Sequence, residues 1–346
     1  MTAGPDTEAQ KLNETQRLIG IVRSFAERRV VVVGDAVADQ FLYGEISRVS
    51  REAPVLILRH ERTETVPGGA ANCAHNLATL GARSALVAVV GDDEAGAALV
   101  AKLGGAGVDC RGVTRAGARR TTTKVRVLAG HAHSLKQQVI RVDYETPATD
   151  DGALNSQLAS RLRELAAGAD ACVVSDYNYG VASGEVVEAL RVLARDRGVP
   201  VFVDSRFRLT ELAGFTSATP NEDEVEHTLG SRLDDVGQLE AAADDLLARL
   251  KHRALLVTRG KNGMLLVEQG APRQHIAAVG ERDAVDVTGA GDTVIATYAL
   301  ALASGASFAD AARLANHAGG IVVMKRGTAC VSADELIGSI TESAAA

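Results

Sequence analysis

The sequence contains no tryptophan, and aromatic residues make up only 3% of its 346 residues. Proteins that bind single-stranded nucleic acid usually stack its bases on aromatic side chains. Basic residues are not concentrated either, because the longest Lys/Arg blocks are pairs such as Arg28-Arg29 and Arg119-Arg120, and the formal net charge is −7. Nucleic acids and anionic membranes require a strongly positive surface. We therefore expect a small-molecule partner, with no nucleic acid and no membrane as ligand.

Long apolar runs and paired cysteines are also missing. No segment approaches the roughly 20 apolar residues of a membrane helix, and residues 1–25 lack the basic start and apolar stretch of a secretion signal. The four cysteines, Cys73, Cys110, Cys172 and Cys330, lie far apart and form no C-x-x-C pair. This distribution is typical of reduced thiols, so we expect a cytoplasmic protein.

The chain alternates apolar strands with helices. Residues 8–27 have apolar positions at helical spacing and precede a run of four valines that ends at Gly34. Further helices are predicted over 68–81, 94–107, 185–198 and 239–250, and further strands over 84–92, 170–177, 199–205 and 254–260. This alternation predicts an α/β fold with a mostly parallel central sheet and helices on both faces. We expect an N-terminal helical extension at 1–28, a main domain at 29–340 and a frayed tail at 341–346.

Two segments break this pattern. Residues 41–66 and 120–144 are rich in β-branched residues and alternate in polarity, without a helical signal. They predict a small antiparallel sheet that projects from the main domain. Such a sheet has one face to cover, so it serves as a lid over the site, as a dimer contact, or as both. His131 and His133 fall in its loop and are expected to be exposed; no H-E-x-x-H or Cys/His spacing indicates zinc.

Polar residues follow several predicted strands. They are Asp35, Asp92, Asp176, Asp204 and the pair Thr258-Arg259. In open α/β sheets the ligand binds beyond the carboxyl ends of the strands, so these positions indicate where a site assembles. An aspartate after a strand can also cap the next helix, and we favour that interpretation for Asp92.

The stretch "DVTGAGDTV" carries the strongest functional signal. Gly289, Ala290 and Gly291 allow close approach of a ligand, and the following residues predict a helix whose first amides and positive end would hold an anion. Asp292 would lie beside that anion, where its carboxylate could accept the proton of an attacking hydroxyl. Asp292 could equally be a plain helix N-cap, and both interpretations remain open.

A second glycine pair, Gly68-Gly69, precedes a predicted helix that contains Asn72. Backbone amides and the Asn72 amide could hydrogen-bond a polyol, or the glycines could merely form a tight strand-to-helix turn. Asp35 and Asp39, after the first strand, could each accept hydrogen bonds from sugar hydroxyls, although one of them could be only structural.

In "TPNEDEVE", Asn221 and Glu224 share a helix face and could order a hydrated Mg²⁺ at a phosphate. A capping arrangement around Thr219 or Asn221 is the alternative. Neither G-x-x-x-x-G-K-[ST] nor G-x-G-x-x-G follows a strand, which argues against a P-loop enzyme and against a dinucleotide-dependent dehydrogenase. A non-catalytic regulator that binds a sugar phosphate is a further possibility, and the intact glycines and Asp292 argue against it.

The ordered set "PGGAAN", "SDY", "TPNEDE", "VTRGKNG", "DVTGAGDT" and "LANHAGGIVV" resembles the ribokinase-like (PfkB) sugar kinases from about Val30 to Val331. Within that family, "GDAVADQFLYGEISRVSREAPV", "TTTKVRVL" and "QQVIRVDYE" look like the bacterial heptose 7-phosphate kinases. Those enzymes phosphorylate the anomeric hydroxyl of D-glycero-D-manno-heptose 7-phosphate. The resemblance implies a kinase that uses ATP and Mg²⁺, with a monovalent cation near Asp286 as a further option.

The resemblance also implies roles for individual residues. Asp292 would be the catalytic base, and Gly289, Ala290 and Gly291 the anion hole. The nucleotide and its magnesium would lie near Asn221, Glu224 (through water), Thr258, Gly260, Gly263, Asn316 and Arg206. The sugar would lie near Asp35, Asp39, Gly68, Gly69, Asn72, Gln138, Arg141 and Asp176. The lid would pair between the subunits of a homodimer.

Two positions depart from the heptose kinases. These usually read "SDYxKG" and "DPK", whereas this chain reads "SDYNYG" and "DSRF", so Tyr179 and Arg206 stand where lysines are expected. Arg206 keeps the charge as a planar fork, and Tyr179 loses it. Another sugar or cyclitol phosphate is therefore an alternative substrate.

Overall fold

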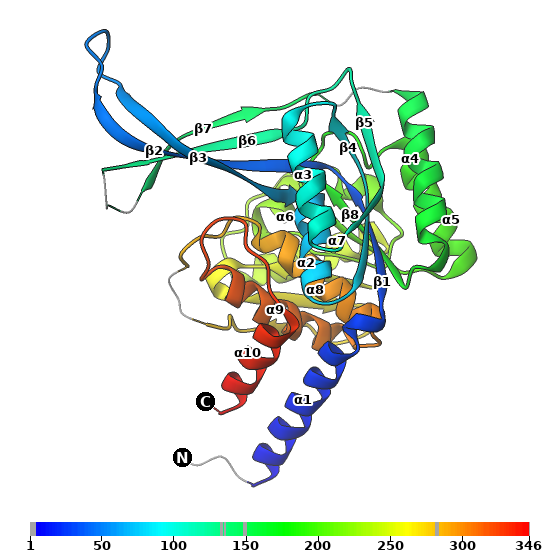
Figure 1. Ribbon diagram of the computed structural model, residues 1–346. Coiled ribbons are helices and arrows are strands. Elements are labelled where there is room, and N and C mark those ends of the chain that lie inside the picture. The colour runs from blue at the N-terminus through cyan, green and yellow to red at the C-terminus, as the bar shows by residue number, and fades with distance from the viewer. Residues whose placement is uncertain (1–4, 132–133, 135, 148–150, 281–283, 346) are drawn as a thin grey trace.

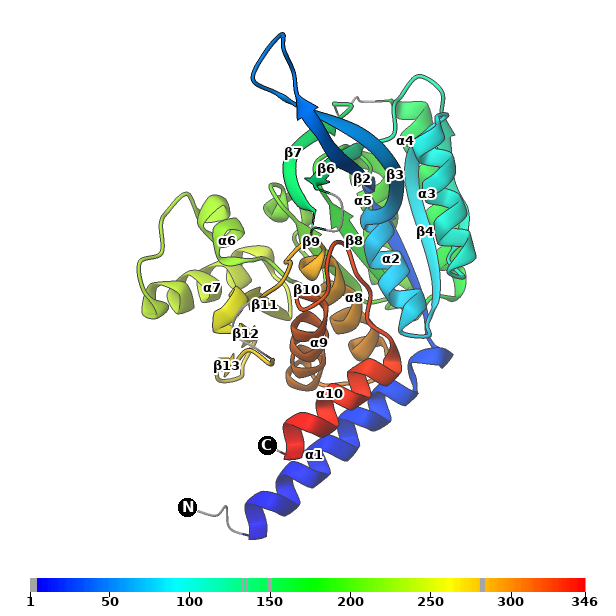
Figure 2. The ribbon, with the colours of Figure 1, turned by 60° about the vertical axis from the view of Figure 1, so that its left-hand side comes forward.

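The computed structural model describes residues 5–131, 134, 136–147, 151–280 and 284–345 (Figure 1). Within these residues the strands form two sheets, one of nine strands and one of four. The larger sheet lies inside the body of the molecule with helices packed around it, and the smaller sheet projects as an arm (Figures 1 and 2). This arrangement confirms the predicted α/β fold class.

The order of the larger sheet is β13-β12-β11-β10-β9-β8-β1-β4-β5. Its strands are β1 (Arg29–Gly34), β4 (Arg83–Gly91), β5 (Asp109–Ala116), β8 (Ala171–Asp176), β9 (Val201–Ser205), β10 (Ser217–Ala218), β11 (Ala254–Thr258), β12 (Met264–Glu268) and β13 (Gln274–Ile276). All pairs from β11 to β5 are parallel, and β12 and β13 add an antiparallel edge. The carboxyl ends of the parallel strands therefore meet along one edge, where ligands bind in such sheets.

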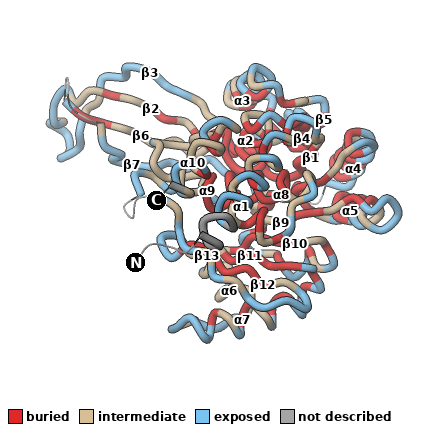
Figure 3. The backbone as a smooth tube through the Cα atoms, turned by 90° about the horizontal axis from the view of Figure 1, so that it is seen from below, coloured by how far each residue is buried: buried red, intermediate tan, exposed pale blue. Residues whose placement is uncertain are grey.

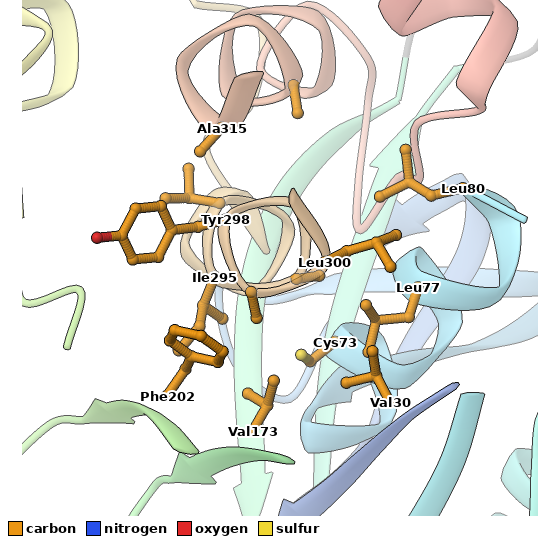
Figure 4. Packing of buried hydrophobic residues seen from close by; sticks show 14 of the residues in the cluster. Val30, Cys73, Leu77, Leu80, Val173, Phe202, Ile295, Tyr298, Leu300 and Ala315 are labelled. Carbon is orange, nitrogen blue, oxygen red and sulfur yellow. The ribbon is translucent and has the colours of Figure 1, made fainter. Parts of the chain in front are cut away.

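Alternate residues of the central strand β1 face two different hydrophobic cores. Val30 and Val32 belong to a core with α1, α2, α3, α8, α9 and α10, and Val31 and Val33 to a core with α4, α5, α6 and α7. The helices between the ends of the chain are α2 (Ala70–Thr79), α3 (Glu94–Gly105), α4 (Gly152–Leu165), α5 (Gly184–Arg197), α6 (Glu222–Leu229), α7 (Val236–Leu250), α8 (Ala290–Ala303) and α9 (Phe308–Val322). Figure 4 shows side chains of the first core packed around α8.

The two ends of the chain form neighbouring helices. Helix α1 (Pro5–Arg23) and the 3-10 turn Phe25–Glu27 make up the N-terminal extension, and α1 packs along α10 (Ala333–Ala345) (Figure 2). The prediction of a frayed tail does not match residues 341–345, which continue α10, because apolar residues of this helix are buried in the first core. Ala346 lies outside the described residues.

The arm is a four-stranded sheet in the order β3-β2-β6-β7, here called the lid sheet. Its strands are β2 (Ala36–Val49), β3 (Leu56–Gly69), β6 (Thr123–Gly130) and β7 (Gln137–Tyr144). They lie mostly within the two segments predicted as a lid, 41–66 and 120–144, and β2 and β3 extend the first segment toward the body. Pairs β2–β3 and β6–β7 are antiparallel as expected, but β2 and β6 run parallel, so the sheet is mixed. His131 is exposed, and His133 lies outside the described residues.

The two faces of the lid sheet differ in chemistry, because successive side chains of a strand point to opposite faces. The inner face carries Asp39, Phe41, Lys124 and Arg126; the Arg126 guanidinium lies 5.4 Å from the Phe41 ring centre and forms an ion pair with Asp39. The outer face carries Leu42, Val125, Val127, Ile140 and Val142. Much of the arm is exposed, whereas buried segments gather in the body (Figure 3).

The sequence predicted that the chain has no membrane helix and that its cysteines are free thiols. Among the described residues, no helix has both the length and the apolar character needed to cross a bilayer. All four cysteines lie in the described part of the chain and none forms a disulfide; Cys73 and Cys172 are buried, while Cys110 and Cys330 are partly exposed. The predicted free thiols are therefore confirmed.

Candidate active site

The N-terminus of α8 forms the centre of the candidate site. Gly289 is the N-cap and has a φ of 78°; a Cβ there would lie 2.6 Å from Nδ2 of Asn72, so only glycine fits. The amide of Ala290 donates to the Val287 carbonyl at 3.2 Å, which occupies one of the three groups predicted for the anion hole. The amides of Gly291 and Asp292 have no acceptor among the described residues, so they and the helix dipole are available to an anion.

Asp292 is buried directly behind this amide turn. Its Oδ2 accepts a hydrogen bond from Nδ2 of Asn72 and its Oδ1 accepts one from the Tyr177 hydroxyl, both at 2.9 Å. Since Gly289 is the N-cap, Asp292 is not the plain cap that the sequence left possible. Burial raises the pKa of Asp292 to about 6, against the lowering effect of the two hydrogen bonds. A carboxylate with this pKa suits a general base near neutral pH.

Asn72, which the sequence assigned to the sugar, contacts the base. Its side-chain amide donates to Asp292 and also, at 3.4 Å, to the Gly289 carbonyl, while its Oδ1 accepts from Asn76 at 3.1 Å. These contacts fix the orientation of the amide and use both of its hydrogens. In this structure Asn72 therefore orients Asp292 and leaves no free N–H for a polyol.

Asp35, also predicted to bind sugar, organises the loop that follows β8. Its carboxylate accepts hydrogen bonds from the backbone amides of Tyr177, Tyr179 and Val181 at 2.8, 2.9 and 3.1 Å. Burial is the largest effect on Asp35 and raises its pKa, whereas these amides oppose the rise. Asp35 thus holds the loop so that the Tyr177 hydroxyl meets Asp292, the structural role that the sequence left open for one of the two aspartates.

Asp176 is equally occupied. It accepts hydrogen bonds from Nη2 of Arg208 at 2.8 Å and from the Ser205 hydroxyl at 2.7 Å, and its side chain is fully buried. A carboxylate saturated in this way anchors the loop rather than presenting itself to a sugar. Another expectation fails by one residue: Asp93 caps α3 by accepting from the Gly96 amide at 2.8 Å, whereas Asp92 is exposed.

Asp39 lies at the root of the lid, beside the glycine pair. Its carboxylate pairs with Arg126 and accepts from the Thr328 hydroxyl at 3.2 Å. A Cβ on Gly68 would lie 2.5 Å from the Asp39 carboxylate, and one on Gly69 would lie 2.6 Å from the Asp35 carbonyl oxygen. Both glycines are therefore needed for close packing at the strand-to-helix turn. Arg126 lies within "TTTKVRVL" but was not predicted as a site residue.

A groove of about 720 Å³ separates the inner face of the lid from residues 285–288 and 326–328. Its lid wall includes Gln138, as predicted, together with Phe41 and Arg126, and the opposite wall includes Thr328. Arg141 instead hydrogen-bonds Asp143 at 2.9 Å and does not line this groove. The volume is within the range of pockets for small ligands. We call it the acceptor groove.

Asp286, predicted near a monovalent cation, also lines the acceptor groove. Its carboxylate accepts hydrogen bonds from the amides of Thr288 and Gly327, each at 2.9 Å. Burial opposes ionisation, but these hydrogen bonds prevail and lower the pKa of Asp286. Asp286 is therefore an ionised group that ties two turns of the groove together.

A second pocket, of about 210 Å³, lies on the other side of the α8 N-terminus. It brings together the predicted nucleotide residues Thr258, Gly260, Gly263 and Asn316 with Gly291 of the anion hole. The Asn316 amide donates to the Ala277 carbonyl at 2.7 Å. Apolar side chains from the α8 and α9 region complete the wall. We call it the nucleotide pocket, and Gly291 links it to Asp292.

Asn221 and Glu224 form the capping box that the sequence offered as an alternative. The Asn221 side chain accepts from the Glu224 amide at 2.8 Å, and the Glu224 carboxylate accepts from the Asn221 amide at 2.9 Å. Arg206 lines a pocket with both residues, and its guanidinium lies 4.7 Å from the centre of the Tyr177 ring. Although Glu224 takes part in the capping box, it still lines this pocket.

Asp204, which ends β9, adds a carboxylate to the same region. Burial raises the pKa of Glu224, and burial together with repulsion from Glu224 and Asp292 raises the pKa of Asp204 well above the ordinary value. The positive charge of Arg206 opposes both rises, and carboxylates of this kind fit a hard divalent cation. No group of three or more His, Cys, Asp or Glu in the described chain could hold a metal by itself. The residues therefore fit Mg²⁺ held mainly by water and phosphates, as Mg²⁺ usually is.

Three residues of the site were not predicted from the sequence: Tyr177, Arg126 and Asp204. "SDY" and "TTTKVRVL" stand out as motifs, but nothing local indicates that Tyr177 reaches Asp292, 115 residues away. Asp204 was noted only as a strand end. The rule that ligands bind beyond the carboxyl ends of parallel strands located this carboxylate correctly, but it did not predict which residues lie next to it.

The chain is similar to proteins of known family and fold. A model of the pfkB family of carbohydrate kinases matches residues 27–334. "Bifunctional protein HldE" from Pseudomonas aeruginosa is 44% identical over 313 residues, which cover 90% of this chain and 63% of that protein. The protein of the same name from Paramagnetospirillum magneticum is 40% identical over 328 residues, covering 94% and 66%. The chain thus spans somewhat less than two thirds of the length of these relatives.

Solved structures of low identity share the fold. Escherichia coli phosphofructokinase-2 in complex with substrates and products has a TM-score of 0.74 at 20% identity, covering 91% of this chain and 99% of that one. Arabidopsis thaliana ribokinase complexed with ribose and ATP has a TM-score of 0.68 at 21% identity, covering 90% and 98%. Because the family model matches residues 27–334, the chain belongs to the pfkB family of carbohydrate kinases and is a sugar kinase.

Proposed function

We propose that this kinase transfers the terminal phosphoryl group of ATP to the anomeric hydroxyl of a heptose 7-phosphate. The reaction would convert D-glycero-D-manno-heptose 7-phosphate to the 1,7-bisphosphate. The observation that carries the proposal is the buried Asp292, which directly follows Gly291 of the nucleotide pocket and comes four residues after Thr288 of the acceptor groove, beside the free amide of Gly291. The resemblance of the lid segments to heptose 7-phosphate kinases and the relatives named HldE, at 40–44% identity, support the choice of sugar.

In the proposed mechanism the acceptor hydroxyl lies against Asp292. The carboxylate accepts its proton as the oxygen attacks the terminal phosphorus of ATP and the bond to the ADP oxygen breaks. Asn72 and Tyr177 orient the carboxylate, and the first amides of α8 stabilise charge on the transferred group. Asn221 and Glu224 would hold Mg²⁺ through water near the phosphates, where the ion supplies charge neutralisation.

The substitution Asp292→Asn tests the assignment of the base. The amide keeps the shape but cannot accept the proton, so kcat should fall about 10²–10⁴-fold. ADP release with ATP, Mg²⁺ and heptose 7-phosphate measures the rate, and phosphorus NMR of the product locates the new phosphate. Turnover by the variant at the parent rate would remove Asp292 from the chemistry.

A kinase for a different sugar or cyclitol phosphate is the second candidate, because Tyr179 and Arg206 stand where heptose kinases carry lysines. A panel of sugar and cyclitol phosphates assayed for ADP release separates the two candidates, since the preferred acceptor has the highest kcat/KM. Tight binding of a sugar phosphate without ADP release would instead favour a non-catalytic regulator.

We also propose a cytoplasmic homodimer that pairs through the outer face of the lid sheet. Ile140 and Val142 are 55% and 38% exposed there, together with neighbouring apolar residues. An exposed apolar sheet face of this kind is normally covered by a partner. Ile140→Lys should convert a dimer to a monomer in analytical ultracentrifugation. A monomeric parent protein would contradict the pairing.

A further inference from the structure

The loop that follows β8 connects Asp292 to the lid sheet. Its residues Tyr177 and Tyr179 donate their backbone amides to the same oxygen of Asp35, at 2.8 and 2.9 Å. The hydroxyl of Tyr177 donates to Asp292, whereas the hydroxyl of Tyr179 donates to Glu145, the residue directly after β7. The two phenols therefore contact different parts of the molecule, one the start of α8 and the other the end of a lid strand.

Asn178, between the two tyrosines, explains why their side chains diverge. In an extended chain the side chains of residues 177 and 179 would point to the same side. Asn178 has a φ of 67°, in the left-handed region that asparagine tolerates better than most residues. This turn breaks the extended alternation, so that Tyr177 reaches α8 and Tyr179 reaches the lid.

Further hydrogen bonds tie the same loop to the base of the lid sheet. Nη2 of Arg119 donates to the Tyr179 carbonyl at 3.0 Å and to the Pro147 carbonyl at 3.4 Å. The Thr146 hydroxyl donates to the Arg120 carbonyl at 3.2 Å. The two arginines precede β6, and Thr146 and Pro147 follow β7. Both strands are thus held to the loop where they join the body.

The Tyr179 side chain is suited to this contact because it remains a neutral donor. Burial is the largest effect that raises its pKa, the hydrogen bond and charge of Glu145 and the charge of Asp143 add to the rise, and Arg206 opposes it. A phenol that stays protonated keeps its hydrogen for the carboxylate. A lysine, which heptose kinases usually carry here, could meet the same carboxylate as an ion pair. The tyrosine therefore keeps a donor at this position without the charge.

We propose that Tyr179 is a positioning residue that couples the lid sheet to the catalytic base. Its hydrogen bond to Glu145 holds the end of β7 against the loop, and the loop in turn holds the Tyr177 hydroxyl against Asp292. In the proposed reaction the acceptor contacts both the lid and the base, so this link fixes the two sides of its site relative to each other. The inference rests on the proposed role of Asp292 as the base. It explains the tyrosine as a different way of holding the lid, without requiring a different acceptor.

The substitution Tyr179→Phe removes only the donor. We expect kcat/KM for the acceptor to fall about three- to tenfold, a modest value for a hydrogen bond to a charged group because the contact is partly exposed to water. The KM for ATP should not change. Tyr179→Lys should restore most of the activity through an ion pair with Glu145.

Tyr144→Phe is the matched control. Tyr144 is the last residue of β7 and is 40% exposed, and its hydroxyl has no hydrogen-bond partner in the described part of the chain. The substitution removes the same atom from a neighbouring tyrosine and should leave the kinetics unchanged. A loss as large as that of Tyr179→Phe would overturn the inference, because the effect would then belong to any change at the end of this strand.

The pH profile of kcat/KM distinguishes positioning from a general loss of structure. The hydrogen bond from Tyr177 lowers the pKa of Asp292, so a loop released from the lid should weaken it and move the acid limb to higher pH. In the double variant Tyr177→Phe/Tyr179→Phe the limb should lie where Tyr177→Phe alone places it, because both substitutions act through one hydroxyl. The substitutions leave in place the other side chains that act on this pKa, which are Asn72, Asp39 and Arg206.

Two results of this measurement would overturn the inference. The first is a lower kcat/KM for Tyr179→Phe with the acid limb unmoved, which is the result expected when a substitution only reduces the amount of folded enzyme. The second is an additive displacement of the limb in the double variant, which would show that Tyr179 acts on Asp292 by a route that does not include Tyr177.

Amide hydrogen exchange separates this inference from the proposed function. If Asp292→Asn kept the parent rate, the assignment of the base would fail, but the link between loop and lid could still be measured without any substrate. Tyr179→Phe should speed exchange in β7, whereas Tyr144→Phe should not, and exchange in the central strand β1 should stay as slow as in the parent. Equal exchange of β7 in parent and variant would overturn the link. Faster exchange in β1 as well would also overturn it, because Tyr179 would then support the whole fold.

Discussion

On the nucleotide side of the α8 N-terminus the pocket is formed largely by backbone and small residues, whereas on the acceptor side charged side chains converge from separate elements. Gly260, Gly263 and Gly291 line the first side. On the second side Asp39 and Arg126 come from two lid strands, and Tyr177 comes from the loop after β8. The difference indicates that the nucleotide side can accept one common donor, while side-chain changes on the acceptor side can alter the choice of sugar.

The largest change in stability is expected where the two sides meet, at Asp292. An unfolded aspartate has a pKa near 3.9, and burial raises that of Asp292 to about 6. Between these values the folded state binds more protons, so the stability of the parent protein falls as pH rises from about 4 to 6 and then levels off. Asp292→Asn removes the free-energy cost of ionising this buried carboxyl and should add up to about 3 kcal/mol to the free energy of unfolding at pH 8.

Urea unfolding of parent and variant at pH 8 and pH 4 measures this effect. The advantage of Asp292→Asn should be largest at pH 8 and should largely disappear near pH 4, where the folded parent carboxyl is protonated and the unfolded one is about half protonated. A variant that is less stable than the parent at pH 8 would show that the hydrogen bonds from Asn72 and Tyr177 outweigh the burial of charge.

A smaller change in stability is expected from a substitution on the nucleotide side alone. Gly263 has a φ of 80°, and a Cβ there would lie 1.9 Å from the Ile276 carbonyl oxygen. Gly263→Ala should therefore lower the free energy of unfolding by about 1–3 kcal/mol and raise the KM for ATP. The KM for the acceptor should not change. Steady-state kinetics with each substrate varied in turn checks this, and Gly270→Ala, at a second left-handed turn with open space around it, controls for backbone strain.

The smallest effect is expected from Tyr177→Phe on the acceptor side. The phenol hydrogen bond lowers the pKa of Asp292, so its removal should raise that pKa and move the acid limb of kcat/KM to higher pH. At neutral pH the loss should be about tenfold, the value of one hydrogen bond to a charged group. A pH profile displaced toward lower pH would contradict this role. An unchanged KM for ATP would show that the effect is confined to the acceptor side.

The same contrast explains how far the sequence could be interpreted. Glycine motifs report local backbone needs, and Gly260, Gly263 and Gly291 do line one pocket, while their role at a nucleotide stays a prediction. The acceptor side was predicted less well. Asp35 and Asp176 are chemically suitable for sugar binding, but only the fold reveals that backbone amides and Arg208 already occupy them.

For the fold, the apolar strands β1, β4, β8, β9 and β11 and the helices α2, α3, α5, α7 and α8 were predicted from the sequence. The antiparallel edge strands β12 and β13 and the outer strand β5 were not among the predicted strands. β5 has a mixed polar sequence, because an edge strand buries fewer of its residues. Asp92 was predicted as the cap of α3, but Asp93 is the cap. Two adjacent aspartates have equal capping propensity, so only the path of the folded chain determines which of them caps the helix.

The four valines of β1 are interchangeable along the strand, so apolar burial alone would tolerate a slip of two residues. Polar contacts at both ends exclude that slip. The Arg29 amide donates to the Asp170 carboxylate at 2.7 Å, and Asp35 binds the three amides of the loop after β8. The residue that sets the register of the central strand is thus also the one that brings Tyr177 to Asp292. The correct alignment of the core and the position of Tyr177 at Asp292 consequently depend on the same carboxylate.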